Sequence, residues 1–294
     1  MLLLNVMIRL ENDFLKVEIA TKGAELQALF SKETQIEYLW NGDANFWGKH
    51  SPVLFPIVGS LKNDSYIYKD KTYHLPRHGF ARDHEFTATK LTNTEAVFTL
   101  TDTADTIKAY PFPFELKLNY RIIERKLSIS YTVTNKGTAK MYFSLGAHPA
   151  FAVPNTPATK YEDYYLAFND DERLTFWKLD EGLVANETET IELNSHKLTL
   201  KHDLFYNDAL VFKTLQSNCI SLLNTKNDYG LHFHFDDFPF FGIWAAKDAP
   251  FVCLEPWCGV ADGINHNQKL TNKEGITKLE AGKSWERCWE VECF

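Results

Sequence analysis

Apolar and polar residues alternate with a period of two along much of this chain. Residues 126–134 read Lys-Leu-Ser-Ile-Ser-Tyr-Thr-Val-Thr, and residues 115–122 place their apolar side chains on one face. Such alternation, rich in β-branched and aromatic residues, is typical of half-buried antiparallel strands. The same pattern predicts further strands over residues 95–101, 191–200 and 231–235.

Helical signals are weak by comparison. No window of a dozen residues carries an apolar stripe of helical period, and only residues 103–109 predict one or two helical turns before the prolines at 111 and 113. The apolar residues 1–8 predict a first strand. Turn signals follow the strands, as in Asn135-Lys136-Gly137 and Glu181-Gly182. We therefore expect an all-β chain with two large antiparallel sheets, and no linker divides residues 1–294 into separate domains.

Composition narrows the range of functions. The chain has 294 residues, of which 45% are hydrophobic, as in a globular protein with a large core. Its formal net charge of −8 gives no general attraction to nucleic acid or anionic lipid, so neither is expected as a partner. The five cysteines form no CxxC pair, which argues against a disulfide framework and favours a reducing cytoplasm. Residues 1–8 are too short to span a membrane.

One loop is cationic and contains a histidine. In Pro76-Arg77-His78-Gly79-Phe80-Ala81-Arg82 the ring of His78 lies between two arginines, and all three side chains can donate to hydroxyl, carboxylate or phosphate oxygens. A turn with solvated charges is the alternative. The preceding apolar segment, residues 51–59, holds two prolines and is expected to form an irregular loop wall.

Two further residues stand out because of their apolar surroundings. His148 follows an apolar strand and precedes Pro149, a position that suits an acid–base group but also a hydrogen-bonded core histidine. Glu255 lies within the apolar and aromatic segment 251–262. Burial there raises the pKa of a carboxyl group and makes it a usable base near neutral pH. Trp257 adds a flat face of the kind on which sugars pack.

Other candidates have simpler readings. Asp208 precedes an apolar strand, and its residue context favours a strand-start or turn carboxylate. His232 and His234 have a metal-ligand spacing, but they alternate with apolar residues as the polar face of a strand does. Asp236-Asp237 with Glu255 would supply the carboxylates of a glycosidase. Two cysteines of the apolar segment, Cys253 and Cys258, are expected to be small core residues.

Six stretches together resemble a known family. SPVLFPIVG, PRHGFAR, YPFPFEL, SLGAHPAF, LFYNDALVF and FVCLEPWCGVAD occur in the order found in the aldose 1-epimerase (galactose mutarotase-like) family. The similarity is greatest to its LacX-type branch, near the glucose-6-phosphate 1-epimerases. The resemblance implies a β-supersandwich, a single galactose mutarotase-like domain over residues 1–294, and a cleft that binds a sugar or a sugar phosphate.

The resemblance also implies an isomerase and its two catalytic residues. Glu255 matches the base that takes the proton of the anomeric hydroxyl, and His148 matches the acid that protonates the ring oxygen as the ring opens. These groups suffice without a metal or redox cofactor. We expect Glu255 to be ionised and His148 protonated, each charge stabilising the other, with a bell-shaped pH profile that is not flat across the neutral range.

The remaining implied residues bind substrate. His78 matches a histidine that contacts the sugar near its ring oxygen, and Asp208 matches a carboxylate that binds sugar hydroxyls, with Asp203 as the alternative. Arg82 matches an arginine that helps to hold the substrate in the sugar-phosphate branch. A phosphate would need a cationic pocket, for which the chain offers Arg77, Arg82, Lys49 and Lys62.

Two other functions remain compatible with these residues. One is a non-catalytic carbohydrate-binding or sensor protein on the same fold, since a fold does not determine function. The other is a carbohydrate hydrolase or lyase. The preferred sugar, its phosphorylation and the oligomeric state stay open at this point.

Overall fold

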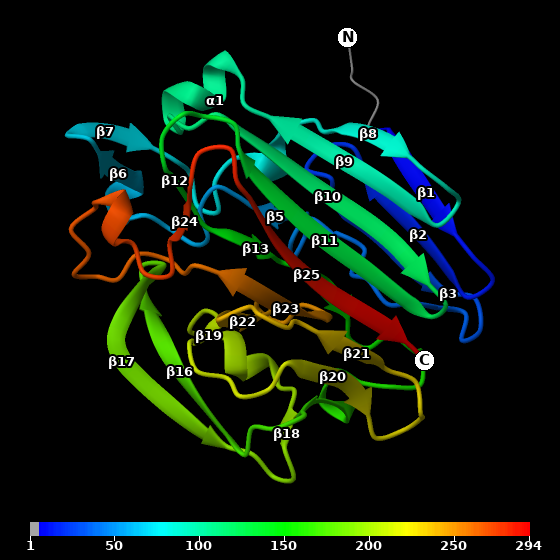
Figure 1. The fold of residues 1–294 in the computed structure, drawn as a ribbon. Coiled ribbons are helices and arrows are strands. Elements are labelled where there is room, and N and C mark those ends of the chain that lie inside the picture. Colours follow the sequence, from blue (N-terminus) through cyan, green and yellow to red (C-terminus); the bar gives the residue numbers. More distant parts are fainter. Residues whose placement is uncertain (1–5) are drawn as a thin grey trace.

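The structure is a computed structural model that describes residues 6–294, and within them every pairing between named strands is antiparallel (Figure 1). The larger sheet has nine strands in the order β18 (Lys197–Thr199), β15 (Tyr164–Phe168), β20 (Cys219–Asn224), β21 (Leu231–His234), β25 (Ser284–Cys293), β11 (Lys126–Asn135), β10 (Phe114–Ile123), β9 (Glu95–Thr101) and β8 (Thr87–Lys90).

The second sheet has eight strands and carries the candidate site. Their order is β17 (Leu183–Glu192), β16 (Arg173–Asp180), β19 (Leu210–Phe212), β22 (Phe240–Trp244), β23 (Phe251–Cys258), β13 (Leu145–Ala147) and β5 (Val53–Leu54), and β14 (Ala150–Ala152) pairs with β23.

Smaller elements flank these sheets. Four strands form a sheet of their own: β1 (Met7–Glu11), β2 (Leu15–Ala20), β3 (Leu26–Ser31) and β4 (Ile36–Glu37). Two pairs are β6 (Ser65–Tyr68) with β7 (Lys71–His74), and β12 (Met141–Phe143) with β24 (Thr277–Leu279). The helix α1 spans Ala104–Ala109, and 3-10 turns span Lys62–Asp64, Ala81–Asp83, Tyr161–Asp163, His202–Phe205 and Leu270–Asn272.

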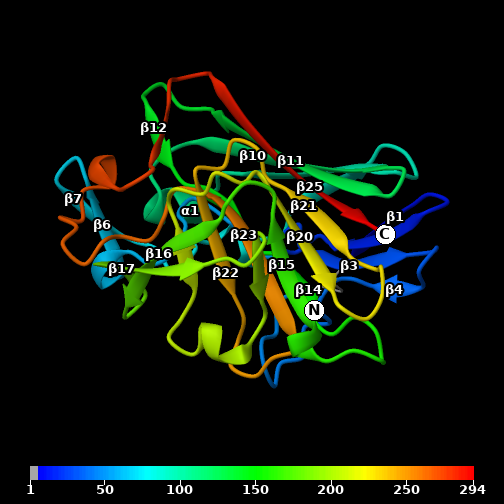
Figure 2. The same ribbon diagram turned by 90° about the horizontal axis from the view of Figure 1, so that it is seen from below.

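Alternating side chains hold the two large sheets together. Along β11 the buried positions alternate with half-buried ones, as the sequence pattern predicts. In Figure 2, β22 and β23 lie beside β20 and β21 of the nine-stranded sheet. Phe233 of β21 and Phe235, which follows the end of that strand, pack against Phe241 of β22 with ring centroids 6.2 and 4.3 Å apart. The all-β supersandwich with two large antiparallel sheets is therefore confirmed.

Most of the predicted elements are confirmed, and one is wrong. Strands occupy 95–101, 115–122 and 126–134, and a strand covers most of 231–235. The helix at 103–109 forms with Thr103 as its N-cap, whose side chain accepts from the backbone N–H of Thr106. The strand predicted at 191–200 is instead interrupted by a turn in which Ser195 and His196 have positive φ, and the chain passes there from one large sheet to the other.

At the N-terminus, residues 1–5 of the predicted first strand lie outside the described residues, and β1 begins at Met7. The segment 51–59 is irregular except for β5, as expected. Across residues 6–294, no helix combines the length and the apolarity that a bilayer crossing would need.

Candidate active site

A cavity of about 630 Å³ opens beside the eight-stranded sheet. Glu255 and Trp257 of β23 lie in its wall, and His148 enters from the turn between β13 and β14. Loops after β5, β16 and β23 complete it. A volume of this size is typical of a small-molecule site.

The strand β23 is held rigidly at the centre of its sheet. All eight of its residues are buried, and it pairs with β22 on one side and with β13 and β14 on the other. The indole of Trp257 lies against Gly146 and Gly242 on the flanking strands, where an added Cβ would come within 2.6 and 2.5 Å of it. Because neither glycine has a side chain, the indole can pack closely against both strands, and this packing positions Trp257 beside the cavity.

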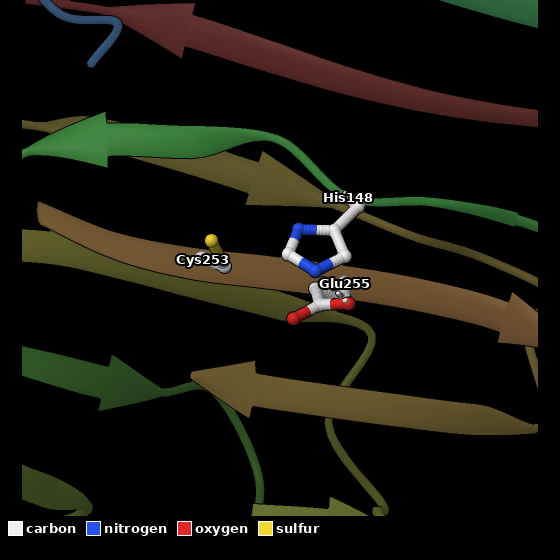
Figure 3. A group of neighbouring side chains, drawn as sticks. All are labelled: His148, Cys253 and Glu255. Carbon is white, nitrogen blue, oxygen red and sulfur yellow. Dashed lines mark ion pairs between the residues drawn. The ribbon is translucent and has the colours of Figure 1, made fainter. Parts of the chain in front are cut away.

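His148 and Glu255 form the chemical centre of the cavity. Nε2 of His148 lies 3.2 Å from Oε2 of Glu255, and the two residues are only 7% and 2% exposed (Figure 3). Trp47 stacks on the imidazole with ring centroids 4.8 Å apart, and Trp244 meets it edge-on at 5.7 Å. The two tryptophans restrict the ring to an orientation in which it faces Glu255.

Burial determines the protonation of this pair. It raises the pKa of Glu255 well above its usual value and lowers the pKa of His148 to about 3. These directions are opposite to those expected from mutual charge stabilisation, because loss of water outweighs the attraction between the two groups. Burial opposes a net charge, so the pair favours one shared proton. The positive charge of Arg77 lowers the pKa of Glu255 and thus favours the carboxylate.

His78 lies on a tight loop beside this pair. His78 and Gly79 have φ angles of 69° and 72°, a left-handed backbone that glycine adopts freely and histidine only at a cost. The ring of His78 is buried, meets that of His148 at right angles with centroids 5.8 Å apart, and lines the cavity. Burial lowers the pKa of His78 well below its usual value, so the ring is neutral.

Of the two aspartates considered for sugar binding, Asp208 lies in the cavity. It has a φ of 95°, its own Oδ1 accepts from the backbone N–H of Ala209 at 2.7 Å, and its charge raises the pKa of Glu255. Asp203 lines only a neighbouring cavity of about 430 Å³, which Asp208 also borders. The strained backbone at Asp208 is typical of a functional position.

Two of the four candidate cations reach the cavity. Arg77 and Arg82 line it, whereas the amines of Lys49 and Lys62 contact a surface carboxylate and a backbone carbonyl elsewhere. Nη2 of Arg82 donates to the carbonyl of Arg77 at 2.9 Å. Its buried Nε lies 3.8 Å from Oδ2 of Asp83 and has no hydrogen-bond partner in the described part of the chain. Burial lowers the pKa of Arg82. An anionic ligand would satisfy this guanidinium.

A buried ionic cluster centred on Asp262 joins the loops behind the cavity. Its carboxylate lies 2.9 Å from Nζ of Lys273 and 3.1 Å from Nδ1 of His266, and accepts from the backbone N–H of Lys62 at 3.0 Å. Burial raises the pKa of Asp262, but the hydrogen bond from His266 and the charge of Lys273 lower it to about 2. The carbonyl of Asp262 also accepts from the backbone N–H of Val184.

Several residues of the cavity escaped the sequence analysis. Trp47 lies in a loop without a motif, and Trp244 gives only the weak signal of an aromatic residue at a strand end. The sequence indicated a turn at Glu181-Gly182 but not that this turn borders the cavity. Tyr206, two residues before Asp208, also lines the cavity and gave no signal beyond its apolar context.

Asp236 and Asp237, the carboxylates considered with Glu255 for a glycosidase, line a separate cavity that shares no residue with that of Glu255. His232 and His234 lie half-buried on one face of β21, as expected for the polar face of a strand. Cys253 and Cys258 are buried, also as expected. Among residues 6–294, the group of side chains found with the spacing of metal ligands is His148, Cys253 and Glu255.

Comparisons with known proteins agree with this fold. The model of the family described as aldose 1-epimerase matches residues 6–288. The chromosomal LacX protein of Lactococcus lactis subsp. lactis is 35% identical over 282 residues, covering 92% of this chain and 94% of the relative. A galactose mutarotase related enzyme from Lactobacillus acidophilus has a TM-score of 0.94 at 35% identity, covering 98% of this chain and 97% of the other. A galactose mutarotase-like protein from Lactobacillus casei ATCC 334 has a TM-score of 0.92 at 33% identity, covering 98% of this chain and 100% of the other.

Proposed function

This chain belongs to the aldose 1-epimerase family, and we propose that it interconverts the α and β anomers of a hexose or hexose 6-phosphate. One observation carries the proposal: an imidazole nitrogen and a carboxylate oxygen lie 3.2 Å apart in the wall of a sugar-sized cavity. The anomeric hydroxyl and the ring oxygen are bonded to the same carbon. A base and an acid that lie side by side can therefore reach both oxygens of one bound sugar.

The reaction is a transfer of two protons. Glu255 as carboxylate takes the proton of the anomeric hydroxyl, and His148 as imidazolium gives a proton to the ring oxygen while the bond from that oxygen to the anomeric carbon breaks. The open-chain aldehyde rotates about its first carbon–carbon bond. The ring then closes on the other face with the roles reversed, which inverts the anomeric centre and restores both groups.

Burial favours the protonation state that accompanies the open-chain sugar. After ring opening Glu255 is protonated and His148 is neutral, and this is the uncharged form that a buried pair prefers. The reactive ion pair is reached by moving one proton across the 3.2 Å contact. The positive charge of Arg77 lowers the pKa of Glu255 and also that of His148, so it favours the carboxylate but opposes the imidazolium.

Other lining residues account for binding. Asp208 is placed to accept from sugar hydroxyls, His78 to donate to a sugar oxygen, and the faces of Trp47 and Trp257 to pack against the apolar side of the sugar ring. The finer proposal is that the hexose is phosphorylated. Arg77 and Arg82 support it, because the buried Nε of Arg82 lacks a partner that a phosphate oxygen would supply.

The proposal is tested by saturation-transfer NMR of anomer exchange on glucose, galactose and their 6-phosphates. The protein is compared with Glu255→Gln and His148→Asn, and with His232→Asn as a control on another strand. Loss of one acid–base group is expected to slow exchange by about 10²–10⁴-fold, while the control stays active. The sugar with the largest rate enhancement identifies the substrate class.

Absence of exchange on all four sugars, with the protein folded, would contradict the proposal. Sugar binding without exchange would then indicate a carbohydrate-binding or sensor protein. Release of reducing ends from oligosaccharides would instead indicate a hydrolase.

A further inference from the structure

A thiol lies directly behind the catalytic pair. Cys253 and Glu255 are two residues apart on β23, so their side chains leave the strand on the same face, and His148 approaches that face from the end of β13 (Figure 3). One potential ligand atom from each of the three residues lies within 4.8 Å of the other two. Cys253 is 0% exposed and does not line the cavity, whereas the other two residues do.

We propose that His148, Cys253 and Glu255 form a binding site for Zn²⁺, with the fourth coordination position facing the cavity, and that the bound ion inhibits the enzyme. Imidazole, thiolate and carboxylate are the ligands that Zn²⁺ takes in proteins, and three protein ligands with one open position is a common arrangement. Nothing about the proposed epimerase reaction requires the ion.

The geometry needs only small movements. Three atoms within 4.8 Å of one another share a point no more than about 2.8 Å from each. Each ligand therefore moves by less than about 1 Å to reach the Zn–N and Zn–S distances of ~2.0–2.3 Å. Nδ1 of His148 has no hydrogen-bond partner within residues 6–294, so no second contact opposes a small rotation of the ring.

The charge balance explains why the thiol matters. Without a metal ion the catalytic pair holds one proton and the Cys253 thiol holds its own, whereas Zn²⁺ binds thiolate, carboxylate and neutral imidazole. Zn²⁺ displaces both protons to solvent. The loaded site then contains the ion, one carboxylate, one thiolate and a neutral imidazole, and its net charge is still zero. Without the thiolate, the same site would hold an uncompensated positive charge in a buried place.

Two consequences follow from this exchange of one ion for two protons. The affinity for Zn²⁺ rises by about a hundredfold per pH unit while both protons are present in the empty site. The ion also occupies the lone pairs that Glu255 and His148 use in proton transfer, so inhibition is relieved by a chelator and competes with sugar binding.

The test uses Zn²⁺ and Co²⁺ on the intact protein, on Cys253→Ala, and on Cys258→Ala as the matched control. Cys258 is a buried thiol on the same strand, but at an odd spacing from Cys253 and therefore on the opposite face. Co²⁺ bound to a thiolate gives a sulfur-to-metal charge-transfer band in the near ultraviolet. We expect this band, together with release of two protons per Zn²⁺, in the wild type and in Cys258→Ala but not in Cys253→Ala.

Inhibition of anomer exchange by Zn²⁺ should require at least a hundredfold more ion in Cys253→Ala than in the two other proteins. Cys253→Ser serves if the alanine variant does not fold, as judged by circular dichroism and melting. Equal metal binding and equal inhibition in all variants would overturn the proposal, as would a wild type without the charge-transfer band. The band does not depend on activity, so this result is separable from a failure of the proposed epimerase function.

Discussion

The backbone N–H of Gly59 donates a hydrogen bond of 3.1 Å to Nδ1 of His78, and the carbonyl of Gly59 accepts from the backbone N–H of His78 at 2.9 Å. An amide N–H only donates, so Nδ1 carries no proton. Because burial keeps the ring neutral, its single proton resides on Nε2. Nε of Arg77 is also a donor and lies 3.3 Å from Nε2, and a neutral ring can accept only one of these two hydrogen bonds. The shorter contact, with the backbone amide of Gly59, favours Nδ1 as the acceptor and leaves the exposed Arg77 available to a ligand.

The first prediction concerns this tautomer. A two-bond ¹⁵N–¹H correlation spectrum of histidine-labelled protein should show His78 as a neutral ring with its proton on Nε2 across the neutral range. His78 then donates to a substrate oxygen and does not act as a proton-transferring acid. A signal pattern of imidazolium, or of a ring protonated at Nδ1, would contradict the assignment.

The second prediction is a broad pH profile. The catalytic pair takes up a second proton only at low pH, because burial lowers the pKa of His148 to about 3. It loses its shared proton only at high pH, because burial raises the pKa of Glu255. Between these limits the fraction in the reactive ion pair is constant. Exchange rates should therefore be flat down to about pH 5, in contrast to the bell-shaped profile expected from the sequence.

The same titration supplies the contrary outcome. If the exchange rate instead falls at low pH with a midpoint at about 6.5, the ordinary pKa of an imidazole, His148 titrates as an exposed group and the prediction is wrong. Rates are measured at saturating sugar so that the profile reports the bound enzyme.

The third prediction concerns the arginines. Arg82→Gln removes the guanidinium whose buried Nε lacks a partner. A charged hydrogen bond contributes roughly 1.5–3 kcal/mol, so kcat/KM for a hexose 6-phosphate should fall about 10- to 100-fold, with little change for the free hexose. Lys49→Gln is the control, because Lys49 does not line the cavity. Equal losses on both sugars would remove the argument for a phosphate.

The fourth prediction separates the two aspartates. Asp208→Asn keeps a residue that tolerates positive φ but loses the negative charge, and kcat/KM should fall by roughly 10-fold or more. Asp203→Asn, outside the cavity, should leave exchange nearly unchanged. The reverse ranking of the two variants would transfer the role of sugar ligand to Asp203.

The fifth prediction concerns stability. Lys273 is fully buried against Asp262, and Lys273→Met leaves that carboxylate without its cation, which should cost about 3–5 kcal/mol in urea unfolding at neutral pH. The pKa of Asp262 is about 2 in the folded state, below the usual value of 3.8 for this group. Its contribution is therefore present above about pH 4 and is lost as the pH falls towards 2.

Asp262→Asn is the companion measurement. It should flatten this acid dependence in addition to lowering stability. An unchanged urea midpoint in both variants would show that the cluster contributes nothing to folding.

The fold was accessible from sequence where a strand has one buried face. In 126–134 the period-two pattern persists because each inward residue packs between the sheets. The pattern failed at 191–200 for a physical reason as well. The apolar positions change from Ile191 and Leu193 to Leu198 and Leu200, and the four polar residues 194–197 between them hold the turn, so the alternation breaks where the chain passes from one sheet to the other.

The site was accessible only where a motif or an improbable context drew attention to a residue. Glu255 was conspicuous as a charge in an apolar segment, and the structure places it against His148. Trp47 was not, because its role depends on stacking against a residue about a hundred positions away. The pair Asp262 and Lys273 also passed unnoticed, since ordinary charged residues reveal their burial only in three dimensions.

The contact between the backbone of Lys62 and the carboxylate of Asp262 joins residues separated by 200 positions. During synthesis on the ribosome, the early loops that carry Gly59 and His78 emerge long before β23 and Asp262 do. A nascent chain thus has no sugar site until its last quarter is released. Until then the apolar surface of these early loops stays exposed to solvent. Truncated or stalled chains are expected to depend on chaperones, and sugar cannot stabilise them.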